Sequence, residues 1–179
     1  MLNGIIEASE EKQAPLIIAI HPDELRFTGV EIVAAIAAKA NKTALPICVH
    51  LDHGGNFEQV QLAIQSGFTS VMIDGSKFPF AENIAVTKKV VEYAHAKGVV
   101  VEAELGRLAG VEDAVNVSAK DSSYTDPEQA VEFVHKTGCD SLAIAIGTSH
   151  GAFKFKGEAK LDFARLKTIA ALLPGFPLV

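Results

Sequence analysis

The chain has 179 residues and a mass of 19.0 kDa, of which 49% are hydrophobic and 21% are charged. This size suits one substantial folded domain, and the composition excludes a disordered chain. No uncharged apolar run approaches the ~18 residues of a membrane span, which excludes a transmembrane protein. The formal net charge is −6, and the basic residues are thinly spread, which argues against a nucleic-acid partner.

The N-terminal segment lacks the basic start and apolar core of a secretory signal, so a cytoplasmic protein is expected. Cys48 and Cys139 lie in apolar segments, and we interpret them as reduced core thiols rather than a disulfide.

Short β-rich segments alternate with amphipathic helical segments along the chain. After a helix-like segment at Leu2–Lys12, strands are predicted at Pro15–Ile20, Pro46–His50, Thr69–Ile73, Val99–Glu104 and Ser141–Ile146, with a sixth opening at Phe176–Val179. Between them, helices are predicted at Gly29–Asn41, Asn56–Ser66, Phe80–Ala96, Asp126–Thr137 and Leu161–Leu172. Helix caps are expected at Thr28, Asn56 and Asp126, and left-handed C-terminal caps at Gly67, Gly98 and Gly138. This order predicts parallel strands joined by helical crossovers.

Two architectures fit such a pattern: an open doubly wound sheet and a closed α/β barrel. The turn after the first strand reads Ile20–Glu24, without the glycines of a phosphate-binding turn, and this favours the TIM (β/α)8 barrel. Because eight units typically take ~250 residues, we expect an incomplete barrel forming one domain over residues 1–179. It would hold strands 2 to 6 and the start of strand 7, with one strand before Met1 and about two after Val179 missing.

Ionisable residues follow the apolar part of four predicted strands, and a parallel barrel would gather these strand ends at one face, where such enzymes build their active sites. They are Asp52 and His53, Asp74, Glu102 and Glu104, and His150. Period-two alternation puts Glu102 and Glu104 on the same side of their strand. The strand before Asp52 is expected to end near Leu51, with Gly54 and Gly55 freeing the backbone to turn.

Histidines with carboxylates behind them predict a divalent-metal site, most simply a zinc site. His21, His95 and His135 lack this context, and we interpret them as structural.

Five ordered segments at these positions resemble the class II, metal-dependent ketose-bisphosphate aldolases, which act on fructose or tagatose bisphosphate. The segments are His50–Gly54, Ser70–Ser76, Val101–Gly106, Tyr124–Pro127 and Ala145–Gly151. The resemblance extends over nearly the whole chain, and five ordered segments are far more specific than any one of them.

The resemblance implies a role for each matching residue. His53 and His150 correspond to zinc ligands, Glu104 and Asp74 to carboxylates close to the metal, and Asp52 to the acid/base group that serves the aldehyde oxygen. Glu112 corresponds to a glutamate on a mobile loop that transfers the proton at the ketose carbon. Gly151, beside Ser149, corresponds to a contact with dihydroxyacetone phosphate or with a monovalent cation, Na⁺ or K⁺, beside its phosphate.

The resemblance also implies reversible cleavage of a ketose 1,6-bisphosphate into dihydroxyacetone phosphate and glyceraldehyde 3-phosphate, by a lyase of glycolysis or related carbohydrate metabolism. A homodimer or homotetramer is implied as well. The family's third zinc histidine, in a His-Gly-x-Ser-Gly segment, would follow directly after Val179, so activity of these 179 residues alone is not expected.

The long segment Arg107–Ser123 is interpreted as a lid loop over the reaction centre. Three rival functions remain open. A Schiff-base aldolase needs a lysine inside the barrel, whereas none of the predicted strands contains one. A metal-dependent sugar-phosphate epimerase would break no carbon–carbon bond. A noncatalytic scaffold protein derived from an aldolase would do no chemistry.

Overall fold

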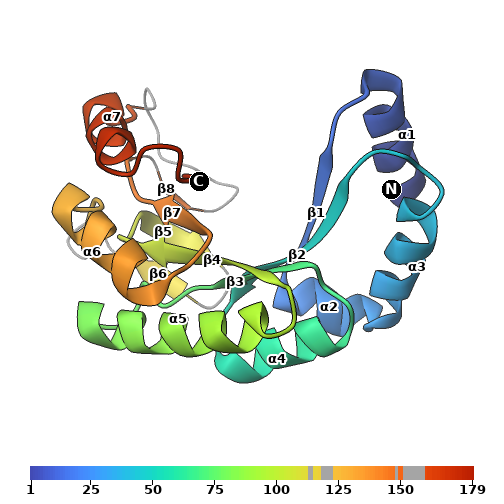
Figure 1. The fold of residues 1–179 in the computed structure, drawn as a ribbon, viewed down its shortest axis with the longest axis horizontal. Helices are drawn as coiled ribbons and strands as arrows, with labels where there is room; N and C mark the ends of the chain where they lie inside the picture. The colour runs from blue at the N-terminus through green and yellow to red at the C-terminus, as the bar shows by residue number, and fades with distance from the viewer. Residues whose placement is uncertain (113–114, 118–122, 148, 151–159) are drawn as a thin grey trace. The chain divides into compact units, whose positions relative to one another are not determined.

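The computed structural model describes residues 1–112, 115–117, 123–147, 149–150 and 160–179 (Figure 1). Its five-stranded sheet has the order β1-β2-β3-β4-β7. These strands are β1 (Leu16–Ile20), β2 (Ile47–Gly54), β3 (Ser70–Ile73), β4 (Val100–Leu105) and β7 (Ser141–Ile144). A second sheet has the order β6-β5-β8 and consists of β5 (Ala109–Glu112), β6 (Val115–Val117) and β8 (Ser149–His150).

Helices occupy most connections between the strands of the larger sheet. They are α1 (Leu2–Lys12), α2 (Pro22–Thr28), α3 (Glu31–Ala40), α4 (Phe57–Gln65), α5 (Phe80–His95), α6 (Pro127–Thr137) and α7 (Phe163–Leu172). None of the helices in the described ranges is both long and apolar enough to cross a bilayer.

The order of the strands decides between the two predicted architectures. Neighbouring strands of the larger sheet follow one another in chain order. A doubly wound sheet instead contains a point at which the strand order reverses, whereas strands that succeed one another without reversal are those of a (β/α)8 barrel. The prediction of an α/β fold with part of a TIM barrel is therefore confirmed.

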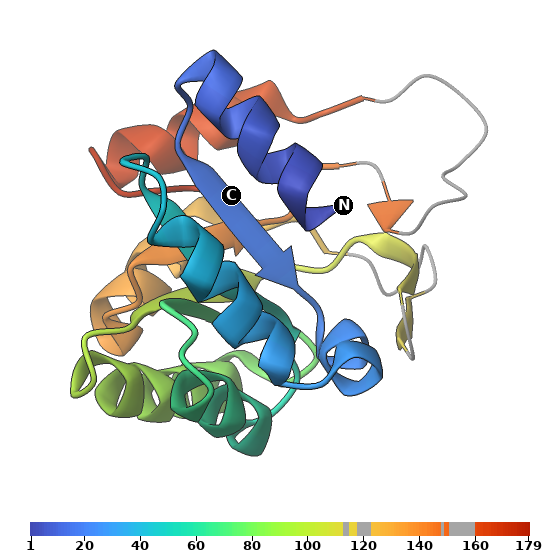
Figure 2. The same cartoon turned by 90° about the vertical axis from the view of Figure 1, so that its right-hand side faces the viewer.

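The described chain divides into two compact units, of which the first holds residues 1–74 and 92–101. β1 and β2 pair in parallel from Leu16 opposite Ile47 to Ile20 opposite Leu51. Helices α1 and α3 lie on the same side of these two strands (Figures 1 and 2). The core of this unit consists of fully buried aliphatic and aromatic side chains from β2, β3, α3, α4 and the connection between α4 and β3, among them Leu51, Val71, Ile73, Val33, Val60 and Phe68.

The second unit holds residues 75–91 and 102–179. β4 and β7 pair in parallel from Glu102 opposite Ser141 to Leu105 opposite Ile144. Phe133 of α6 is fully buried, and its ring centroid lies 6.2 Å from that of Phe80. The predicted sixth strand begins to pair as well, because Leu178 forms a parallel bridge with Leu142.

Most predicted helix ends are confirmed by their capping geometry. The Asn56 side chain accepts a hydrogen bond from Gln59 N, and the Asp126 side chain accepts from Glu128 N and Gln129 N. Positive φ angles at the three predicted glycines end the preceding helices, with φ of 98° at Gly67, 71° at Gly98 and 71° at Gly138.

The prediction that Thr28 caps a helix was wrong. Thr28 is the last residue of α2, a short helix absent from the prediction, and α3 begins at Glu31 without a side-chain cap. The N-terminal cap of α2 is His21, whose Nδ1 accepts a hydrogen bond from Asp23 N, while the Glu24 carboxylate accepts from His21 N. This places His21 in a structural role.

The two cysteines differ in burial. Both are free thiols, but only Cys139 is buried, whereas Cys48 is half-buried. Burial raises the pKa of the Cys139 thiol, and a smaller effect of the hydrogen bond with Thr137 lowers it.

Candidate metal centre and active site

The C-terminal end of β2 departs from the predicted geometry. The strand continues to Gly54 instead of ending near Leu51, and its pairing with β3 shifts between Leu51 and Gly54. The backbone turns at His53, with φ 47°, and not at a glycine. Gly54 is needed for another reason: a Cβ there would collide with the carbonyl oxygen of Met72 on β3. This irregularity is a bulge of the kind that redirects a side chain near a functional site.

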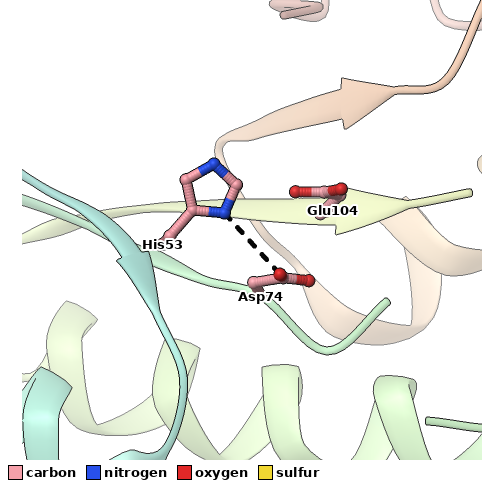
Figure 3. Close-up of side chains that lie close together, drawn as sticks. All are labelled: His53, Asp74 and Glu104. Carbon is pink, nitrogen blue, oxygen red and sulfur yellow. Dashed lines mark ion pairs between the residues drawn. The ribbon is translucent and has the colours of Figure 1, made fainter. Parts of the chain in front are cut away.

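His53 faces Asp74, the residue that follows β3. His53 Nδ1 lies 3.6 Å from Asp74 Oδ2, and the two side chains are 21% and 22% exposed (Figure 3). The backbone helps to place the pair, because Asp74 N donates to Gly54 O at 2.9 Å. A carboxylate on Nδ1 fixes the tautomer of an imidazole so that Nε2 is the ring nitrogen that binds a metal.

His50 lies deeper in the same strand. It is buried, and its Nδ1 lies 2.7 Å from Ser70 Oγ on β3. Burial lowers the pKa of His50; the charge of Asp52 opposes this shift, and the charge of His53 adds to it. Asp52, the predicted acid/base residue, is half-buried and acts electrostatically on His50.

The two glutamates of β4 share one side of the strand, as predicted. Val101, Ala103 and Leu105 are buried, and the alternating residues Glu102 and Glu104 are half-buried.

The backbone of Glu104 is held by a residue that the sequence analysis missed. Asn83 Nδ2 of α5 donates to Glu104 O at 2.9 Å, and the Asn83 side chain is buried with its Oδ1 accepting from Thr87. The sequence did offer one signal for this role, because Asn83 places an amide at an apolar position of the predicted helix Phe80–Ala96. His53 and Asp74, which lie in the same compact unit, could each offer a ligand atom to a metal ion (Figure 3).

The segment Arg107–Ser123 is not simply the loop that was predicted. It contains β5 and β6, which pair in antiparallel fashion with Gly110 opposite Val117. β5 also pairs in parallel with β8, with Ala109 opposite Ser149 and Gly110 opposite His150. The strand that carries Glu112 is therefore joined to the strand that carries His150. The side chains of Glu112, Ser149 and His150, and the whole of Gly151, lie outside the described residues.

A cavity of about 550 Å³ follows the end of β4. Its wall includes Ser76, Asn83, Arg107 and Tyr124, and sequence analysis assigned none of these a role. Arg107 Nε donates to Ser76 O at 2.7 Å.

The remaining histidines of the sequence lie on helices or cap one. His95 lies in the last turn of α5 and His135 in the last turn of α6. The His21 ring, however, lies 6.3 Å from the ring of His53, a proximity that the sequence did not indicate.

The family model of class II fructose-bisphosphate aldolase matches the chain over residues 1–179. The chain belongs to this family. Two curated relatives carry the name fructose-bisphosphate aldolase. The protein of Thermus caldophilus is 50% identical over 98% of this chain and 57% of its own length, and that of Helicobacter pylori strain 26695 is 47% identical over 100% and 59%. The chain thus spans less than three fifths of the length of these relatives.

Solved structures of similar proteins agree with this membership. The YdjI aldolase from Escherichia coli K12 is similar with a TM-score of 0.83 and 38% identity, over 99% of this chain and 61% of that one. A putative fructose-1,6-biphosphate aldolase from Coccidioides immitis has a TM-score of 0.88 and 34% identity, over 99% and 62%.

Proposed function

We propose that the full-length protein is a class II aldolase that reversibly cleaves fructose or tagatose 1,6-bisphosphate into dihydroxyacetone phosphate and glyceraldehyde 3-phosphate. The observation that carries the proposal is the family match over residues 1–179, together with His53 and its carboxylate partner at the end of β2. The names of the two curated relatives support the same activity.

The donor set suits zinc. His53 offers Nε2 while its Nδ1 faces Asp74, which matches the ligand type and the supporting carboxylate of zinc sites. We propose His53, His150 and Glu104 as ligands, with Asp74 close to the metal. A bound zinc ion would supply Lewis-acid polarisation of the substrate carbonyl. A monovalent cation, Na⁺ or K⁺, is proposed beside Gly151.

The proposed chemistry assigns two protons to two carboxylates. For cleavage, Asp52 removes the proton of the C4 hydroxyl as the C3–C4 bond breaks and the C4 carbon becomes the aldehyde. The bonding electrons remain on the dihydroxyacetone phosphate half as an enediolate. Glu112 then delivers a proton to the C3 carbon of that half. Ser149 and Gly151 are proposed to contact the substrate.

The remaining proposals concern the molecule as a whole. We propose one domain over residues 1–179, a cytoplasmic location and a homodimer or homotetramer, with no nucleic acid or membrane as partner.

A rival mechanism has little support in the larger sheet. A Schiff-base aldolase requires a lysine on an inner strand, and β1, β2, β3, β4 and β7 contain none.

The test is cleavage of fructose and tagatose 1,6-bisphosphates by the full-length protein, with and without chelator, with zinc measured in the same sample. We expect chelator-sensitive cleavage with about one zinc per chain. Asp52→Ala should lose at least ~100-fold in kcat and keep its zinc. Asp140→Ala is the matched control, because Asp140 directly precedes the N-terminal end of β7, away from the strand ends that form active sites.

Other outcomes would overturn the proposal. Zinc without cleavage points to another reaction, such as epimerisation. Cleavage that survives chelator and leaves a borohydride-trapped adduct identifies a Schiff-base enzyme. A protein that binds no zinc and cleaves neither substrate would instead be a noncatalytic scaffold. Near-normal turnover by Asp52→Ala removes Asp52 from the mechanism.

A further inference from the structure

Arg107 and Ser123 close the base of the segment that carries Glu112. Arg107 N donates to Ser123 O at 2.7 Å, and Ser123 N donates to Arg107 O at 2.9 Å, which makes an isolated antiparallel bridge. We call this pair the neck. Strand β5 begins at Ala109, shortly after the neck, and Glu112 is its last residue. The geometry of the neck therefore sets the direction in which β5 leaves the larger sheet.

The residues that flank the neck in sequence are tightly packed. Gly106 has φ 101°, and a Cβ on it would lie 2.6 Å from Thr125 Oγ1 and 2.8 Å from the Cβ of Ala145. Thr125 is buried, its hydroxyl donates to Leu105 O, and Ala145 N donates to that hydroxyl oxygen at 2.7 Å. These contacts fix the backbone on both sides of the neck relative to β4 and β7.

The Arg107 side chain connects the neck to a second segment. Its Nε donates to Ser76 O at 2.7 Å, and Ser76 lies in the connection between β3 and α5. Arg107 lines the 550 Å³ cavity together with Asn83, the residue that holds the backbone of Glu104. A planar guanidinium fixes direction as well as distance, which a flexible ammonium does not.

We propose that Arg107 is a positioning residue for Glu112. By holding the neck to Ser76, it sets the orientation of β5 and β6 and thereby the position of Glu112, the last residue of β5. This inference rests on the proposed role of Glu112 in proton transfer, and it adds a residue that the resemblance did not assign.

The distance from the neck to Glu112 makes the effect large. Five extended residues span about 16 Å, so a tilt of about 4° at the neck moves the end of β5 by about 1 Å. A misplacement of about 1 Å in a catalytic group can cost ~100-fold in rate. Loss of the Arg107–Ser76 contact should therefore lower kcat by ~10- to 100-fold, and KM should stay within about 2-fold, because substrate binding does not use this contact.

The experiment compares variants of the full-length, zinc-loaded enzyme: Glu112→Gln, Arg107→Gln, the double variant and Arg107→Lys. The readouts are kcat and KM for cleavage and the exchange of the dihydroxyacetone phosphate proton with deuterated solvent. In that exchange, the carbon-bound proton passes to the Glu112 carboxylate and a solvent deuteron takes its place. Rates are expressed per folded, zinc-containing molecule.

Arg165→Gln is the matched control. Arg165 is also partly buried, and its Nη1 donates to the backbone oxygen of Thr125 at 2.8 Å, on the α7 side of the neck. A merely structural role of Arg107 would lower stability as Arg165→Gln does and would leave the exchange unchanged. A positioning role predicts slow proton exchange in Arg107→Gln but not in Arg165→Gln, and an intermediate exchange rate in Arg107→Lys. It also predicts that the double variant with Glu112→Gln exchanges no more slowly than Glu112→Gln itself.

Two results would overturn the inference, and they are distinguishable. Wild-type exchange in Arg107→Gln together with slow exchange in Glu112→Gln shows that Arg107 does not position Glu112. Wild-type exchange in Glu112→Gln removes Glu112 from the proton transfer and this inference with it, whereas the cleavage and zinc content of the unmodified enzyme still test the aldolase proposal. If Arg107→Gln does not fold, Arg107→Lys is used in its place. An exchange rate below that of the unmodified enzyme then supports the inference, and an equal rate overturns it.

Discussion

His53 adopts a left-handed backbone, with φ 47°, inside a strand that continues to Gly54. For a residue with a Cβ this conformation costs about 1–2 kcal/mol. Surrounding contacts hold it in place, because Gly54 O accepts from Asp74 N and Gly54 pairs with Ile73. The strain thus lies at the residue whose imidazole faces Asp74, which is where backbone strain in proteins tends to accompany function.

The buried His50 gives a prediction for pH. Burial lowers its pKa, so the folded protein holds His50 neutral while the unfolded chain titrates near 6.5. As pH falls below about 6.5, the unfolded state binds a proton first, and the free energy of unfolding decreases until the pH passes the lowered pKa of the folded state.

His50→Gln provides the comparison, since an amide can keep the contact with Ser70 without titrating. Denaturant unfolding of the metal-free protein between pH 7.5 and 5 should show a steeper loss of stability for the unmodified protein than for His50→Gln. Equal slopes would show that His50 does not contribute to acid sensitivity.

At the level of elements, strong periodicity predicted most strands and long helices correctly. The features that it missed depend on an unusual cap or on tertiary contacts. The strands of the larger sheet and the long helices were predicted because their apolar residues repeat at the period of a strand or a helix. Helix α2 was missed because its cap is His21, and an imidazole is not among the side chains expected there. The bulge before Gly54 depends on the approach of Met72 O from β3, and no local pattern encodes that approach.

Two glycines allow a prediction about the turn after β4. Gly106 and Gly98 both have positive φ, 101° and 71°, but a Cβ on Gly106 would meet Thr125 and Ala145, whereas nothing lies within 4 Å of one on Gly98. Gly98→Ala should cost about 1–2 kcal/mol of unfolding free energy from backbone strain alone. Gly106→Ala adds an overpacking cost of about 1–3 kcal/mol.

Urea unfolding of both variants measures the difference directly. The matched pair separates backbone strain from side-chain collision, because only Gly106 has both. Similar losses of stability in the two variants would mean that the turn relaxes to accept a methyl group and that the base of the neck is not rigid.

For the whole molecule, sequence reasoning selects candidate site residues but does not predict their arrangement. Asp52, His53, Asp74 and Glu104 could be selected because each follows the apolar part of a predicted strand, and parallel strand ends share one face. The pairing of β5 with β8 joins the strands of Glu112 and His150, and it depends on contacts between segments far apart in sequence. No periodicity within a single segment could have indicated that pairing.

A shared metal gives the prediction that tests this assembly. If His53 on β2 and His150 on β8 hold the same zinc ion, its binding stabilises the folded full-length protein by about 4 kcal/mol when free zinc is ~1,000-fold above Kd. A chelator should then lower Tm by up to about 10 °C, since each kcal/mol corresponds to about 2–4 °C in a domain of 150–250 residues and to less in a longer chain. His53→Ala and His150→Ala should each abolish most of this chelator-dependent shift. His135→Ala, which removes an exposed histidine at the end of α6, should keep it in full. A full shift in His150→Ala, measured by calorimetry with and without chelator, would exclude β8 from the metal site and leave its pairing with β5 as an architectural contact alone.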